Sequence, residues 1–125
     1  MLLQQNVLLI HDQVVKLHGG SSGIRDINGL ESALARPYQT FGEQDLYPSC
    51  FEKAAAIGES IIMNPPFVDG NKRTGYVLME TLLRIDGYKI NTTNDDLYDF
   101  DIKIATGEVK FEEMVVWLKT NTSKL

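Results

Sequence analysis

Apolar residues recur every three or four positions along most of the chain, which is the spacing of helices that bury one face. The first such stretch covers residues 3–17 and ends at Gly19, where a glycine pair interrupts the pattern. A second, shorter helix is expected after Asn28, which is suited to cap it, and it ends before Pro37. The first third of the chain is therefore predicted to be helical.

A third helix is expected after Ser49, because Ser49 and Glu52 have the spacing of a capping box. Further apolar faces predict helices over residues 78–85, 97–104 and 111–118. Gly87 is expected to end the first of these helices, and Asn94 is expected to cap the second. Only the windows YKINTT and GGSSGIRD resemble strands, and both are too short to carry a sheet. The sequence predicts an all-α bundle of about six helices, forming a single domain over residues 1–125.

Composition narrows the class of protein. With 43% hydrophobic and 23% charged residues, the 125-residue chain is typical of a soluble globular protein. The net charge of −5 opposes direct nucleic-acid binding, which depends on a basic surface. The chain has a single cysteine, no signal-peptide pattern and no apolar run of about 20 residues. We expect a cytoplasmic protein with no membrane partner.

The stretch NPPFVDGNKRTG, residues 64–75, differs from ordinary scaffold. The consecutive prolines Pro65 and Pro66 push the residues before them out of helical geometry, so the preceding helix is expected to end near Met63. An Asp-Gly pair then predicts a turn, and a new helix is expected to begin at Gly70 or Asn71.

The residues at this predicted helix start favour binding of a metal-nucleotide complex. The first amides of a helix attract anions, and Gly70 has no Cβ to keep a phosphate away from them. Lys72 and Arg73 add positive charge, and Asp69 can hold Mg²⁺ between two phosphates. A helix N-cap with a solvated first turn is the alternative, although basic residues there oppose the helix dipole. Physical reasoning alone leaves both interpretations open.

The same stretch carries a family resemblance. FVDGNKRTG after a proline resembles the Fic/Doc superfamily signature, H-P-F-x-[DE]-G-N-[GK]-R, and in particular its death-on-curing (Doc) branch, in which Lys precedes the Arg. IHDQ, GGSSGIRDINGLESALARP, LYPSCFEKAAAIGESI and EEMVVWLK are similar to the Doc pattern in order and spacing. The resemblance therefore extends over nearly the whole chain.

This resemblance implies a Fic fold and the toxin half of a toxin-antitoxin pair, whose antitoxin folds a disordered segment against the toxin. Fic enzymes transfer AMP from ATP to a protein hydroxyl. Doc proteins transfer the γ-phosphate instead, to elongation factor Tu, and so halt translation. The implied cofactors are ATP, as substrate, and Mg²⁺.

The resemblance also implies a role for each motif residue. Phe67 would be a buried anchor and Asp69 a Mg²⁺ ligand. Gly70 and Asn71 would form a phosphate-binding turn, and Lys72 and Arg73 would be catalytic residues that grip the phosphates. Lys72 favours phosphate transfer over AMP transfer, because most Fic enzymes have glycine there. A Fic-type protein adenylyltransferase is the alternative.

The chain departs from the family at the first motif position, where Pro65 replaces a histidine that acts as general base. A positioned base typically contributes about 100- to 10,000-fold, or roughly 3 to 5 kcal/mol. We therefore expect a crippled or inactive enzyme that still folds and binds nucleotide. The chain is either a laboratory or cloning-selected inactive toxin, or a natural pseudoenzyme that binds antitoxin or nucleotide without catalysis.

No other residue is expected to supply the missing base. His18 lies in the last turn before the glycine pair, where a cation suits the helix dipole, and His11 lies beside the apolar stripe, where a structural role is favoured. Arg25 lies in a loop that docks the target or covers the nucleotide, or else it is a surface arginine.

Overall fold

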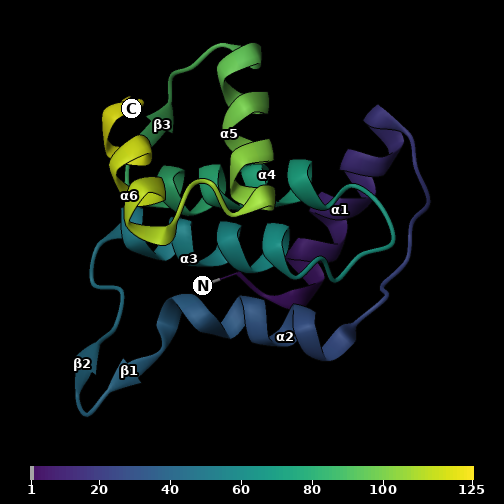
Figure 1. Cartoon of the computed structure of the whole chain (residues 1–125). Helices are drawn as coiled ribbons and strands as arrows, with labels where there is room; N and C mark the ends of the chain where they lie inside the picture. Colours follow the sequence, from purple (N-terminus) through teal and green to yellow (C-terminus); the bar gives the residue numbers. More distant parts are fainter. Residues whose placement is uncertain (1) are drawn as a thin grey trace.

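Helices make up the body of the protein in the computed structural model, which describes residues 2–125 (Figure 1). The α-helices within that range are α1 (Gln4–His18), α2 (Ile27–Ala35), α3 (Cys50–Met63), α4 (Asn71–Ile85), α5 (Asn94–Thr106) and α6 (Phe111–Thr120). Their number and order confirm the predicted all-α bundle. No helix of the described part is long and apolar enough to cross a bilayer.

The strands are short and form two small antiparallel pairs. They are β1 (Thr40–Phe41) with β2 (Gln44–Asp45), and β3 (Tyr88–Ile90) with β4 (Thr122–Lys124), while a 3₁₀ turn, η1 (Arg36–Tyr38), follows α2. Tyr88 lies opposite Lys124 and Ile90 opposite Thr122. The strand-like window YKINTT thus forms β3, and β4 pairs with this strand.

Two predicted helix caps are wrong. The side chain of Asp26, not Asn28, caps α2 by accepting a hydrogen bond from the Gly29 amide at 2.9 Å. Thr93, not Asn94, caps α5. In both cases an earlier residue with extended backbone carries a side-chain oxygen that reaches the free amides, so the helix starts before the predicted cap. The predicted capping box at Ser49 is confirmed.

The core is built around the pair α3 and α4, which cross the middle of Figure 1 with α2 below them and α5 and α6 above. Two glycines allow these helices to approach closely. A Cβ on Gly75 would lie 2.8 Å from Ile62 Cγ1, and a Cβ on Gly58 would lie 2.6 Å from Met79 Cγ. Because the loop between α3 and α4 is the NPPFVDG segment, this tight pair also fixes both ends of the candidate site.

Candidate functional site

The loop between α3 and α4 has the predicted boundaries. α3 ends at Met63, and α4 begins at Asn71 after Gly70, which is in the left-handed region with φ 75°. Glycine adopts this conformation without steric cost. A Cβ on Gly70 would lie 3.3 Å from Val14 Cγ1, so the glycine also lets the loop lie directly against α1.

The loop is held in shape by Asn71. Its side-chain oxygen accepts a hydrogen bond from the Phe67 amide at 3.0 Å, and its side-chain nitrogen donates to the Phe67 carbonyl at 3.1 Å. Phe67 is itself fully buried, as expected for the motif anchor. The side chain of Asn71 is thus committed to the loop, so a ligand at the helix start would meet its backbone amide.

His11 supports the same loop from α1. Its ring stacks on Phe67 with centroids 3.8 Å apart and planes 8° apart, and Nε2 lies 2.8 Å from the Asp69 carbonyl oxygen. Because a carbonyl only accepts, Nε2 carries the proton in this contact. The histidine is 3% exposed, which confirms the structural role favoured for it.

The segment that follows α1 runs alongside the motif and pairs with its backbone. The Pro66 carbonyl accepts hydrogen bonds from the amides of Arg25 and Asp26 at 2.7 and 3.0 Å, and the Val68 amide donates to the Gly23 carbonyl at 3.1 Å. These bonds form a short strand-like contact between residues about 40 positions apart in the chain. Sequence periodicity carried no signal for it, because the pairing is non-local.

Side chains add two further contacts between these segments. The Arg25 guanidinium donates from Nη2 to the Pro65 carbonyl at 2.8 Å, so this arginine is attached to the motif. The Ser21 amide donates to the Asp69 carboxylate at 2.7 Å, and Gly20 lies against the same side chain. The Arg25 side chain therefore holds the main chain at residue 65, and the Ser21 main-chain amide orients the carboxylate of Asp69.

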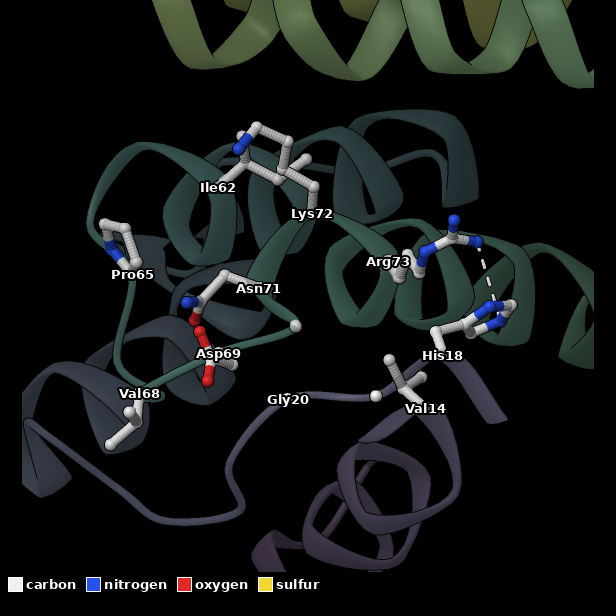
Figure 2. Close-up of a pocket in the computed structure, with 12 residues that line it drawn as sticks. Val14, His18, Gly20, Ile62, Pro65, Val68, Asp69, Asn71, Lys72 and Arg73 are labelled. Carbon is white, nitrogen blue, oxygen red and sulfur yellow. Dashed lines mark hydrogen bonds between the residues drawn. The ribbon is translucent and has the colours of Figure 1, made fainter. Parts of the chain in front are cut away.

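A cavity of about 480 Å³ lies between the end of α1, the motif loop and the start of α4 (Figure 2). Its lining includes the predicted site residues Pro65, Asp69, Gly70, Asn71, Lys72 and Arg73, together with Val14, His18, Gly19, Gly20, Ile62 and Val68. The structure thus brings all predicted polar site residues to one cavity, while the anchor Phe67 lies beneath it.

The cavity has an acidic end and a basic end. Asp69 and Asn71 lie at the loop side in Figure 2, whereas Lys72 extends from the start of α4 toward the green ribbon of α5 and Arg73 extends toward His18. Arg73 Nη1 lies 3.5 Å from His18 Nε2. The predicted position of His18 in the last turn of a helix is confirmed, and only the fold places this helix end beside the cavity.

The donor set suits a phosphate and a hard cation. No side chain of the described residues caps α4, so its first amides have no protein acceptor. Asp69 is the acidic side chain that lines the cavity, and the described residues contain no cluster of three or more His, Cys, Asp or Glu. One carboxylate fits Mg²⁺, which takes its other ligands from phosphates and water, and does not fit a metal held entirely by protein groups.

A buried carboxyl group, Asp101 of α5, lies behind the basic end. It is 6% exposed, and burial raises its pKa to about 7, although the positive charges of Lys72 and Arg73 act to lower it. Asp101 was not among the predicted site residues. The available signal was its spacing with Leu97 and Ile104, which places Asp101 on the apolar face of α5.

Comparison with known proteins identifies the family. A family model described as the Fic/DOC family matches residues 2–83, which cover α1 to most of α4 and include the motif. The chain belongs to the Fic/DOC family. A curated relative, Toxin Doc of Mycolicibacterium smegmatis, is 39% identical over 87 residues. The alignment covers 70% of this chain and 62% of the relative.

Within the Fic/DOC match, the residues that form the cavity come from α1 and the segment after it, the end of α3, the motif loop and α4. The segment from residue 84 onward, which contains α5 and Asp101, lies outside the matched range. The family resemblance inferred from the motif is thus confirmed, whereas the chemistry at the cavity is not assigned by these matches.

Proposed function

We propose that this chain is a Doc-type toxin in lineage, a protein kinase that binds ATP with Mg²⁺ at the α4 cavity and transfers the γ-phosphate to a hydroxyl of elongation factor Tu. In the present form it binds nucleotide but transfers phosphate poorly, because Pro65 stands at the position of the general base. The observation that carries the proposal is the meeting of uncapped amides, two cations and one carboxylate in one cavity.

Each group has a defined part in this proposal. The amides at the start of α4 donate to the phosphate chain, and Lys72 and Arg73 neutralise its charge. Asp69, oriented by the Ser21 amide, holds Mg²⁺, which supplies charge neutralisation at the transferred phosphoryl group. None of these groups is the base, so nucleotide binding is retained when the base is absent. Phosphoryl transfer depends mainly on positioning and charge stabilisation, so these groups also support some residual transfer.

The proline leaves the scaffold of the site in place. Position 65 lines the cavity, and its main-chain carbonyl accepts a hydrogen bond from the Arg25 guanidinium, which does not involve the side chain of residue 65. Pro65 has no group that accepts a proton from an attacking hydroxyl. The expected loss is that of a general base, about 100- to 10,000-fold.

The proposal includes a cognate antitoxin as partner. Its support is the relative's name, Toxin Doc, together with the family match. We expect the antitoxin to supply a disordered segment that folds on binding. A non-catalytic protein that binds antitoxin or nucleotide is the second candidate function, and Pro65 is the observation that favours it.

The test restores the histidine. Pro65→His and the control Pro65→Ala, which removes the proline without adding a base, are incubated with elongation factor Tu and ATP labelled at the α- or γ-position. We expect γ-label transfer and growth arrest only with Pro65→His. Transfer of α-label would instead establish an AMP transferase. A folded Pro65→His variant that neither modifies protein nor arrests growth, while the parent binds an antitoxin, would favour the non-catalytic candidate.

Binding is tested separately in the present chain. We expect Mg-ATP binding that weakens at least tenfold in Lys72→Met, because a charge-assisted contact to phosphate is lost. Lys119→Met on α6 is a matched control, since that lysine is exposed and lies outside the cavity. Equal affinity in the parent and Lys72→Met would refute the assignment of the cavity.

A further inference from the structure

Asp101 is a buried charge that scaffold packing does not explain. It lies on the face of α5 that also buries Phe100 and Ile104 against the core. Its Oδ1 is fully buried, and no described residue donates a hydrogen bond to it. An unpaired carboxylate in such a place costs free energy, which an apolar residue at the same position would avoid.

The groups that act on Asp101 belong to the start of α4. Lys72 and Arg73 attract its negative charge. Burial and the 2.6 Å hydrogen bond to Glu80 raise the pKa of Tyr76, and the charge of Asp101 adds to this shift. No ion pair within 4 Å joins Asp101 to any described residue. Its charge is therefore felt by the cavity cations without being neutralised by direct contact.

Other charged groups near α5 are accounted for elsewhere. Asp99 pairs with Lys103 at 3.0 Å on the solvent side of α5. α3 also packs against α5, and its charged side chains pair elsewhere: Glu52 with Ser49, Lys53 with Asp45 and Glu59 with Arg36. The remaining acids of α5, Asp95 and Asp96, are exposed in its first turn.

We propose that Asp101 is a positioning residue that competes with a bound polyphosphate for Lys72 and Arg73, so that its protonation state sets the affinity of the cavity. The inference rests on the proposed nucleotide site. Figure 2 shows the Lys72 side chain extending away from Asp69 toward the green ribbon of α5, whereas Arg73 extends from the same turn toward His18. An ionised Asp101 attracts both cations through space and repels an incoming anion, whereas a protonated Asp101 does neither.

The direction of the pH effect follows from linkage. A polyphosphate near Lys72 and Arg73 disfavours the ionised carboxyl group, so binding raises the pKa of Asp101 further and takes up a proton. Since burial already raises this pKa to about 7, uptake occurs at neutral and mildly alkaline pH. Affinity for polyphosphate therefore falls as pH rises through about 7.

The experiment compares the parent, Asp101→Asn and the control Asp99→Asn, which makes the same chemical change on the exposed side of α5. Mg-ATP affinity is measured by calorimetry between pH 6 and pH 8.5. We expect Asp101→Asn to bind about three- to tenfold more tightly than the parent at pH 8.5 and equally at pH 6. Titration of ATP is common to all three measurements, so it cancels in the ratio.

Two results would overturn the inference. One is a parent-to-variant affinity ratio that does not change with pH or that favours the parent at pH 8.5. The other is an Asp101 carboxyl group that titrates near its ordinary 3.8 by carbon-13 NMR, or whose pKa fails to rise in Lys72→Met. The NMR result is independent of nucleotide. A normal NMR response without ATP binding at any pH would therefore refute the proposed nucleotide site and the competition at it, while the coupling of Asp101 to Lys72 would stand.

Discussion

The close contact between α3 and α4 predicts that adding one methyl group at Gly75 destabilises the protein. The added Cβ would lie 2.8 Å from Ile62 Cγ1 and 3.1 Å from Ile62 Cδ1, well inside the normal contact distance. Both residues are buried, so neither helix can move without disturbing the core. Gly75→Ala is thus a local measure of how tightly the pair that frames the site is packed.

Two opposing effects set the magnitude. Replacing glycine by alanine inside a helix favours folding by about 0.8 to 1 kcal/mol. Overpacking of a filled core costs about 1 to 3 kcal/mol. We therefore expect a net loss of about 1 kcal/mol in the free energy of unfolding, which corresponds to a decrease of roughly 3 to 5 °C in Tm for a chain of this length.

A double-mutant cycle with Ile62→Ala isolates the steric part. Ile62→Ala removes both carbons that the new methyl group would meet, so Gly75→Ala in that background should become neutral or stabilising. Urea unfolding of the four proteins gives the coupling energy, which we expect to be at least 1 kcal/mol. A coupling near zero, or stabilisation by Gly75→Ala in the parent, would refute the inferred clash.

Two further predictions concern polar groups. Asn71→Ala should lower the free energy of unfolding by about 1 to 3 kcal/mol in urea unfolding, since it removes both side-chain hydrogen bonds to Phe67, and Asn71→Asp should recover part of the loss through its remaining acceptor. Asp101 has a folded-state pKa of about 7, above its ordinary 3.8, so the folded protein binds this proton more tightly than the unfolded chain does. The contribution of Asp101 to stability is therefore lost as pH rises from 3.8 to about 7, by at most about 4 kcal/mol. Unfolding measured from pH 4 to pH 8 should therefore show a steeper decline for the parent than for Asp101→Asn, and parallel curves would contradict the raised pKa.

Most of the fold could be predicted from the sequence because helices are local. The boundary at Met63 followed from two prolines, and the start of α4 followed from an Asp-Gly pair, so both were correct within a residue. The caps of α2 and α5 were wrong because several oxygen-bearing residues occur together near each helix start. Only the backbone conformation of Asp26 and Thr93 decides between them.

The candidate site was predictable where its residues are consecutive and not where they are distant. Asp69 to Arg73 form one motif, so their meeting at one cavity was expected. His18 and Asp101 reach the same region through α1 and α5, and no short-range pattern relates them to the motif. The pairing of Arg25 with the motif backbone is likewise set by tertiary contacts.

The main-chain clamp around Pro66 has a consequence for how this family changes over generations. Residues 65 to 68 are fixed by carbonyl and amide contacts, by a buried phenylalanine and by an asparagine, and none of these depends on which side chain occupies position 65. If Pro65 stands in for a general base, as proposed, a single-base codon change between histidine and proline would alter reactivity and leave the shape of the domain intact. A toxin gene built in this way would be silenced by one mutation and reactivated by its reversal, and the encoded protein would keep its fold throughout.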